Sequence, residues 1–209
     1  MIDWDSCVLW LDSKYFSESY WWDRSKYRNN GVVHGAKWKA NAFYFDGNND
    51  YVDCGEASVL NLTSELTLEV LFNTSEFFDP SYQGLIQRGN WNNGYFLAVR
   101  TAEPHMLRMW FRKDNSGDPV DFGETEVDRW YHAVVTLEED GTAKGYLNGK
   151  LEVTETGCTL GSSIAFLCIG AFFGTVRFHK GKIAVVRIYD EALNEEEIKV
   201  LYRSSYRKL

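Results

Sequence analysis

Short runs of strand-forming residues, separated by turn residues, follow one another along almost the whole chain, and this pattern limits the fold more than any other feature. The run 66–72 is the clearest, because Leu66, Leu68 and Val70 alternate with Thr67 and Glu69, as in a strand with one buried face. Further runs occupy 8–11, 42–46, 51–54, 84–88, 95–101, 107–113, 131–137, 143–147, 150–154, 165–169 and 183–189. A dozen strands with short turns predict an all-β fold, a two-sheet antiparallel jelly-roll sandwich that occupies residues 1–209 as one domain.

Turn and capping residues refine this prediction. The pairs Asp-Gly at 140–141 and Asn-Gly at 148–149 stand between strand runs, where they favour tight hairpins. One helix is expected at the C-terminal end, because Asn194 can cap it and Glu197 occupies the capping-box position. The apolar face of this helix would consist of Ile198, Leu201 and Tyr202.

Composition excludes several classes of protein. The net charge is -8, which argues against a nucleic-acid partner, and no apolar run is long enough for membrane insertion. The residues after Met1 have neither the basic nor the apolar part of a signal peptide. Aromatic residues make up 16% of the chain while only 3 residues are proline, a mixture that suits broad β-sheets and also sugar binding.

The four cysteines have no CxxC spacing, so a zinc site is not expected. They are interpreted as buried thiols, although three disulfide pairings remain formally open. The four are Cys7, Cys54, Cys158 and Cys168.

An ordered set of short segments resembles the laminin-G-like jelly roll of the concanavalin A-like lectin and glucanase superfamily. The similarity extends from about residue 8 to the C-terminus and is carried by the order of the segments, since none is specific alone. The segments are Trp-Leu-Asp at 10–12, Asp-Arg-Ser at 23–25, Asn-Asn-Gly at 29–31, 45–52, 66–72, 129–135, 145–150, 181–183, 187–193 and 196–198. The resemblance implies a sandwich fold and leaves the function open.

The resemblance also implies a structural calcium ion as the one expected cofactor. Relatives often hold calcium near the stretch that matches residues 23–31, where Asp23, Asn29 and Asn30 would supply oxygen ligands. Many relatives carry acidic residues in a late strand where this chain has Ile183-Ala184-Val185, so one acidic contributor is missing. The alternative is that Asp23 caps a turn.

A glycan-binding face is expected on two strand runs. In 107–113 the alternation turns Arg108, Trp110 and Arg112 away from the core, and in 95–101 it places Phe96 and Arg100 on the outer side. If the strands are neighbours, these side chains share one surface, where arginine forks would favour a carboxylated or sulfated sugar. The alternative is that the arginines pair with acids such as Glu69 while Trp110 packs under a loop.

Two further aromatic segments are candidate contact sites. Trp91, Asn92 and Asn93 lie in a Gly-rich and Asn-rich loop that resembles lectin loops, in which side-chain amides form hydrogen bonds with sugar hydroxyls. The second segment, Tyr20, Trp21 and Trp22, is a candidate interface with another subunit, because Trp and Tyr are common interface anchors.

Catalysis is ranked last. Relatives that cleave glucans carry the pattern Glu-x-Asp-x-x-Glu, which Glu124-Thr125-Glu126-Val127-Asp128 does not match, and a glycosidase needs two carboxylates that face each other across the sugar. The expected function is therefore a non-catalytic module that recognises a glycan or surface polysaccharide. The alternatives are a structural protein of a virion or other particle that contacts itself or other particle proteins, and then a glycoside hydrolase. Either of the first two roles places the chain on a particle surface or outside the cell.

Overall fold

The computed structural model describes residues 2–78 and 81–207. The strands are β1 (Cys7–Phe16), β2 (Tyr20–Asp23), β3 (Gly31–His34), β4 (Lys37–Lys39), β5 (Ala42–Asp46), β6 (Tyr51–Asp53), β7 (Leu66–Thr74), β8 (Tyr82–Gly89), β9 (Gly94–Arg100), β10 (Met106–Arg112), β11 (Val120–Glu124), β12 (Trp130–Leu137), β13 (Ala143–Leu147), β14 (Lys150–Glu155), β15 (Leu167–Ile169) and β16 (Lys180–Tyr189). A 3-10 turn spans Ser58–Leu60, and the helix α1 spans Glu195–Tyr206. The predicted all-β fold with one short C-terminal helix is confirmed.

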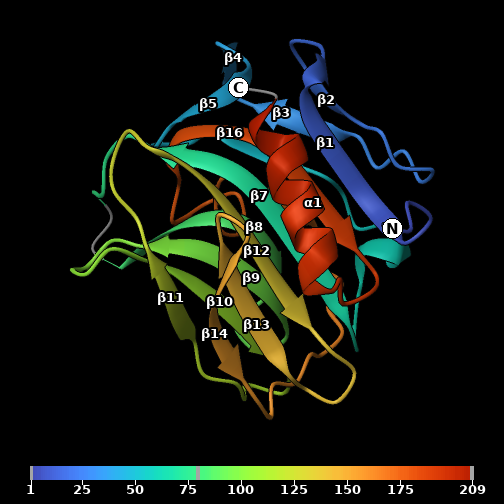
Figure 1. Cartoon of the computed structure of the whole chain (residues 1–209). Helices are drawn as coiled ribbons and strands as arrows, with labels where there is room; N and C mark the ends of the chain where they lie inside the picture. Colours follow the sequence, from blue (N-terminus) through green and yellow to red (C-terminus); the bar gives the residue numbers. More distant parts are fainter. Residues whose placement is uncertain (1, 79–80, 208–209) are drawn as a thin grey trace.

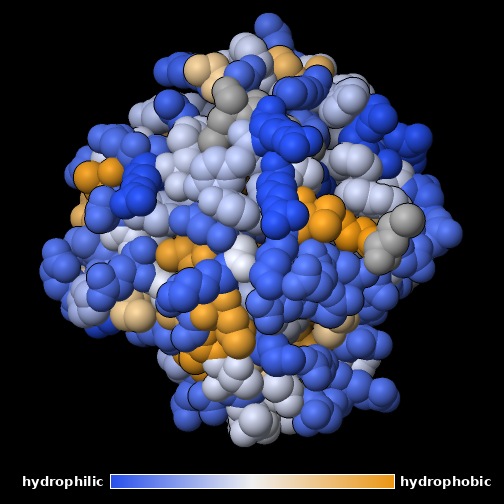
Figure 2. Space-filling view, in the orientation of Figure 1, coloured by the Kyte–Doolittle hydropathy of each residue, from blue (hydrophilic) through white to orange (hydrophobic). Residues whose placement is uncertain are grey.

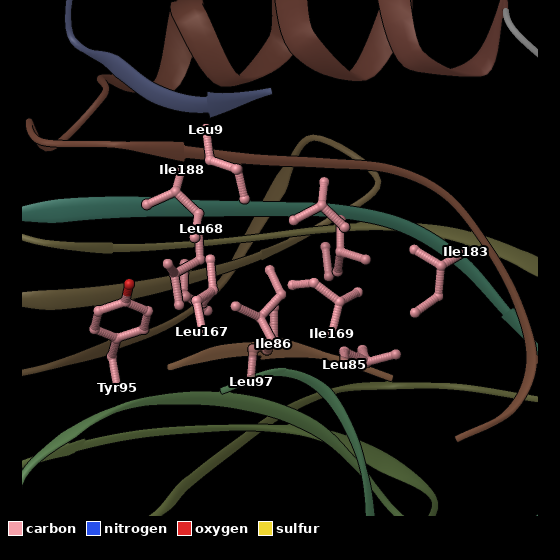
Figure 3. Close-up of a cluster of buried hydrophobic side chains, with 14 of the residues drawn as sticks. Leu9, Leu68, Leu85, Ile86, Tyr95, Leu97, Leu167, Ile169, Ile183 and Ile188 are labelled. Atoms are coloured by element: carbon pink, nitrogen blue, oxygen red, sulfur yellow. The ribbon is translucent and has the colours of Figure 1, made fainter. Parts of the chain in front are cut away.

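The strands form two layers with the main core between them (Figure 1). One layer, the helix-covered sheet, has the order β1-β16-β7-β12-β13-β14, and β5 also pairs with β16. The other layer, the open sheet, has the order β11-β10-β9-β8-β15-β6-β3-β2, and β2 pairs with β1 to join the layers. In Figure 3, Leu9 and Leu68 of the first layer point toward Ile86, Leu97 and Leu167 of the second.

Strand alternation explains how the core is filled. Leu66, Leu68, Val70 and Phe72 all belong to the main core, as the period of the run predicts. The opposite side of β7 is also buried, because Thr67 and Glu69 lie beneath further parts of the chain and are inaccessible to solvent.

The helix α1 crosses the outer face of the helix-covered sheet (Figure 1). Asn194 caps it by accepting hydrogen bonds from the backbone of Glu196 and Glu197, and the Glu197 side chain completes the capping box. Ile198 and Leu201 are buried against Val134, so the helix closes this side of the sandwich.

Sequence patterns miss four short strands, β2, β3, β4 and β11. These strands carry mixed polar and aromatic residues, and long-range pairing holds them in place. The Asn148–Gly149 turn is confirmed, because both residues have positive φ, 52° and 76°, between β13 and β14. At the 140–141 turn, Gly141 alone takes positive φ, 84°.

All four cysteines are free thiols, and Cys7, Cys54 and Cys168 are buried while Cys158 is half-buried. The surface that carries α1 is mainly hydrophilic, with apolar residues gathered in separate patches (Figure 2). Within residues 2–78 and 81–207, no helix is long and apolar enough to cross a membrane.

Candidate functional site

The outer face of the open sheet brings the predicted aromatic and arginine side chains together. In the register of β9 and β10, Phe96 lies opposite Trp110 and Ala98 lies opposite Arg108. Burial alternates along β10, so that Arg108, Trp110 and Arg112 point away from the core. The two strands are neighbours, so the condition for a shared outer face is met.

Five rings form a continuous aromatic cluster on this face. Trp91, in the turn between β8 and β9, is 42% exposed and lies at the solvent side of the cluster. Its ring centroid is 6.2 Å from that of Trp110, 6.5 Å from Phe96, 6.2 Å from Phe172 and 5.1 Å from Phe173. Because the other four rings are buried or half-buried, Trp91 is the ring of this cluster that offers the largest exposed fraction to a ligand.

Phe172 and Phe173 come from the segment between β15 and β16, and no sequence pattern indicates that this segment lies on this face. The backbone N–H of Phe173 donates to Oε1 of Gln87 on β8 at 2.9 Å, and this bond fixes the segment over the open sheet. Gly84 leaves room for Phe172, since a Cβ atom there would lie 2.5 Å from the ring. In the sequence, the pair Phe172-Phe173 followed by Gly174 indicates an aromatic turn. The neighbouring residues do not indicate which strands this turn covers.

A hollow of about 550 Å³ adjoins the aromatic cluster, with Trp91 and Phe173 as its apolar wall and Arg177 as its cationic residue. The Arg177 guanidinium carbon lies 4.7 Å from the centroid of Tyr82. Thr175 and Val176 complete an exposed rim. The hollow has the size and the mixture of apolar and polar groups that small-ligand sites require.

The other arginines of this face are mostly engaged within the chain. Arg108 forms a forked ion pair with Asp121 of β11, with Nε 2.7 Å from Oδ1 and Nη2 3.0 Å from Oδ2. This hydrogen bond with Asp121, and the charge of Asp121, raise the pKa of Arg108 despite its partial burial. Arg100 lies 3.5 Å from the same carboxylate. The acid that pairs with these arginines is therefore Asp121, and Glu69 lies in the other sheet, where it pairs with Arg187.

Trp110 and Arg112 are held by the turn that follows β10. The indole N–H of Trp110 donates to the carbonyl of Gly117 at 2.8 Å, so this ring packs under a loop as the alternative interpretation expected. Arg112 lies over the Trp110 ring, 4.8 Å from its centroid, and donates to the side-chain oxygen of Asn115 at 2.8 Å.

The two asparagines after Trp91 have different roles. The side-chain oxygen of Asn93 accepts from the backbone N–H of Asp114 at 3.0 Å, and the backbone carbonyl of Asn92 accepts from Asn115 at 2.9 Å. These bonds fasten the Trp91 turn to the turn after β10. Asn92 follows Trp91 directly in the chain and is exposed.

The three residues expected to bind calcium lie together but face the protein. The buried carboxylate of Asp23 accepts from the backbone N–H groups of Trp10, Ser25 and Asn29 at 2.7–2.8 Å and from the Ser25 hydroxyl at 2.7 Å. The Asn30 side-chain oxygen accepts from the Asp23 N–H. A cation would have to displace these donors, so the oxygens of Asp23 and Asn30 do not fit calcium as they stand. In the described residues no cluster of three His, Cys, Asp or Glu side chains could hold a metal ion, and calcium binding stays a prediction.

The aromatic segment of β2 divides between the core and the surface. Trp21 is fully buried, with its ring 4.7 Å from that of Phe43, so it has no surface through which to contact another subunit. Tyr20 and Trp22 are about two-fifths exposed and stack on each other with centroids 5.2 Å apart. An interface role for Tyr20 and Trp22 stays a prediction.

The acidic segment at 124–128 lines a separate hollow of about 510 Å³. Glu124 and Glu126 share this hollow with Glu103 and His105, which lie 3.0 Å apart. Glu126 also lies 3.4 Å from Arg129. Three glutamates thus line one hollow beside the end of β11.

Comparisons with solved structures confirm the fold. The Trypanosoma rangeli sialidase superposes with a TM-score of 0.73 at 20% identity, over 97% of this chain and 33% of that one. The botulinum neurotoxin serotype D ligand binding domain, solved with N-acetylneuraminic acid, gives a TM-score of 0.77 at 16% identity, over 96% of this chain and 51% of that one. The receptor binding domain of the botulinum neurotoxin C/D mosaic serotype gives a TM-score of 0.74 at 15% identity, over 97% of this chain and 52% of that one.

The chain thus spans a third to a half of these neighbours, and the likeness concerns the fold. Among curated protein sequences, none matches this chain significantly. A family model described as the concanavalin A-like lectin/glucanases superfamily matches residues 46–199, which is most of the sequence. This chain therefore belongs to the concanavalin A-like lectin/glucanases superfamily.

Proposed function

We propose that this protein is a non-catalytic glycan-binding module and that the surface around Trp91 is its binding site. One observation carries the proposal: Trp91 is an exposed ring, supported from behind by four other rings, at the edge of a hollow that contains Arg177. A sugar ring stacks its C–H face on an exposed aromatic ring. A rigid aromatic support lowers the entropy that is lost on binding.

The polar groups of this site favour an acidic sugar. Arg177 lines the hollow beside Trp91, and a guanidinium binds a carboxylate or sulfate with two parallel hydrogen bonds. The serotype D ligand binding domain, a structural neighbour, was solved with N-acetylneuraminic acid, a carboxylated sugar. That neighbour is about twice as long as this chain, so it supports the class of ligand and does not locate the site.

A glycan array with the intact protein tests the proposal. We expect binding to carboxylated or sulfated glycans, and a roughly thirtyfold loss for Trp91→Ala, because truncation of a central aromatic anchor typically costs about 2 kcal/mol. Trp4→Ala is the matched control, since Trp4 is 47% exposed and stacks on Trp10, away from this cluster. Equal array profiles for Trp91→Ala and the parent protein, or no binding by the parent, would contradict the proposal.

A role in assembly predicts a different result. If Trp91 were an anchor between subunits, the protein would sediment as an oligomer and Trp91→Ala would sediment as a monomer. A monomeric parent that binds glycans favours the binding module. A hydrolase would instead release sugar from the bound glycan, which a reducing-sugar assay on the same samples would detect.

A further inference from the structure

The hairpin of β1 and β2 extends beyond the body of the sandwich. The pairing of β1 with β16 ends at Asp12, opposite Val185, because β5 pairs with the remainder of β16, and beyond this point Phe16 pairs with Trp21 of β2. Lys14, Tyr15 and Phe16 are all exposed. Figure 1 shows this hairpin at the same end of the molecule as β4.

Two hollows adjoin each other at Phe16, which lines both. The cationic hollow, of about 510 Å³, is lined by Lys14, Tyr15, Trp22, Arg24 and Arg28, with Asp23 and Asn30 at its base. The apolar hollow, of about 570 Å³, is lined mainly by Phe16, Val33, Trp38 and Phe43, with Glu18 and Lys37 as its charged residues. Together they form one groove with a charged half and an apolar half.

The cations of the first hollow have no ion-pair partner among the described residues. Within residues 2–78 and 81–207, the ion pairs include none made by Lys14, Arg24 or Arg28. The one carboxylate that lines the hollow, Asp23, is already occupied by four N–H and O–H donors. In a chain with net charge -8, this hollow is a local region of positive charge that would attract an anion.

Aromatic rings shape the cationic hollow. The Arg24 guanidinium carbon lies 4.0 Å from the centroid of Tyr15, so this cation is held against the ring. Arg28 donates to the backbone carbonyl of Asp23 at 3.3 Å. Trp22, which stacks on Tyr20, also lines this hollow.

The rings of the apolar hollow are fixed before any ligand arrives. Phe16 and Trp38 stack with centroids 5.1 Å apart and planes 9° apart, and the edge of Phe43 meets Phe16 at 5.6 Å. The indole N–H of Trp38 donates to the Ser13 carbonyl at 2.8 Å, which ties β4 to the hairpin. Little entropy is therefore lost in ordering these rings when a ligand binds.

We propose that this groove is a second saccharide site, separate from the Trp91 surface, and that it takes an acidic oligosaccharide. A carboxylate or sulfate group of the sugar occupies the cationic hollow, where Arg24 and Arg28 supply charge-assisted hydrogen bonds. The neighbouring sugar ring packs against Phe16 and Trp38. Charge complementarity and the exposed rings identify this occupant, since each hollow has the volume of a small-ligand site.

Calorimetric titration of the full chain tests the site with three defined probes: a trigalacturonate, a sulfated trisaccharide and neutral maltotriose. We expect an anionic trisaccharide to bind and maltotriose to bind much more weakly. The double variant Arg24→Gln/Arg28→Gln should bind the anionic trisaccharide at least about tenfold more weakly, because hydrogen bonds to charged groups are lost. Binding of the trigalacturonate would identify carboxylate as the recognised group, and binding of the sulfated trisaccharide would identify sulfate.

The control variant is Lys150→Gln/Lys199→Gln, which removes the same charge from β14 and α1 and should change affinity less than about twofold. Trp38→Ala should reduce the affinity for trigalacturonate toward that for galacturonate alone, while the affinity for the monosaccharide is unchanged. This comparison separates the apolar half of the groove from the charged half.

Several results would overturn the second site. Equal losses in the two double variants would mean that the anion is attracted by net charge alone. Binding that is lost in Trp91→Ala and retained in Arg24→Gln/Arg28→Gln would remove this site and leave the proposed function intact. No binding of any probe by the parent would remove this site, and self-association of the parent that Trp38→Ala abolishes would show that a second copy occupies the groove.

Discussion

Nη1 of Arg187 donates to both carboxylate oxygens of Glu69, at 2.8 and 2.7 Å, and both side chains are inaccessible to solvent. The two residues lie directly opposite each other on β16 and β7. Nε2 of His132 lies 3.0 Å from Glu69, and the hydroxyl of Ser205 on α1 donates to Glu69 at 2.8 Å. The buried ion pair therefore connects three strands of one sheet to the helix that covers them.

Removal of the negative charge from this pair should destabilise the fold strongly. We expect Glu69→Gln to lower the free energy of unfolding by about 3–5 kcal/mol, because Arg187 is left as a buried charge without a counter-ion. Urea denaturation measures the change. Glu138→Gln is the control, since Glu138 pairs with Lys144 at the surface and should cost less than about 1 kcal/mol. Similar losses in both variants would mean that the buried pair has no special role.

Acid should unfold the protein through the same carboxylate. Burial alone raises the pKa of Glu69, but the charge of Arg187 and the hydrogen bond with His132 outweigh it and lower the pKa to about 2. Since the ordinary pKa is 4.5, the unfolded state binds more protons between these values. The stabilisation is complete above pH 4.5 and is lost as the pH falls toward 2.

Thermal unfolding at a series of pH values measures this effect. The slope of stability between pH 4.5 and 2 should be shallower in Glu69→Gln than in the parent, provided that the variant remains folded. An unchanged slope would assign the acid sensitivity to other carboxylates.

His179 should contribute a second pH dependence at a higher pH. Burial between Phe45 and Phe72 lowers the pKa of His179 to about 4 from an ordinary 6.5. The folded state holds this ring neutral while the unfolded state protonates it, so stability should fall as the pH decreases from 6.5 to 4. The variant His179→Gln should lose this component, and chemical denaturation at pH 7, 6, 5 and 4 would reveal it. A parallel decline in parent and variant would contradict the prediction.

The four cysteines should differ sharply in reactivity. Burial raises the pKa of Cys7 and Cys168 to about 12, and it raises the pKa of Cys54 well above its usual range. The thiolate is the reactive species, so a disulfide reagent at pH 8 should label the half-buried Cys158 first. All four thiols should react once urea has unfolded the protein. Rapid labelling of the native Cys158→Ser variant would contradict this order.

Periodicity predicted which residues of a strand share a face, because side chains alternate along it, but it could not show that both faces of β7 are buried. The outward position of Trp110 followed from the run at 107–113, whereas its place opposite Phe96 is set by the register of β9 and β10. Periodicity could not predict that the Phe172 ring would cover the Phe96 ring, with ring centroids 5.3 Å apart. These two residues are brought together only by the tertiary structure.

The sequence pattern of a strand also could not predict which charged residues form ion pairs. Glu69 was placed on the correct side of its strand, but its partner was set by the register of β16 and proved to be Arg187. Asp121 became the partner of Arg108 because β11 pairs with β10, and β11 has no clear alternation in the sequence. The cationic hollow likewise depends on Arg24 and Arg28 returning to the β1–β2 hairpin, which spacing alone does not show.

The position of α1 makes the two broad sides of the sandwich unequal. One side is closed by the helix, whereas the other side carries the exposed Trp91 with Phe96 and Phe172 packed beneath it. Copies that attached to a common surface through Trp91 would all adopt the same orientation, with α1 directed outward. A label or cargo joined near α1 would then stand away from that surface, and a coating of this protein would present a mainly hydrophilic exterior (Figure 2).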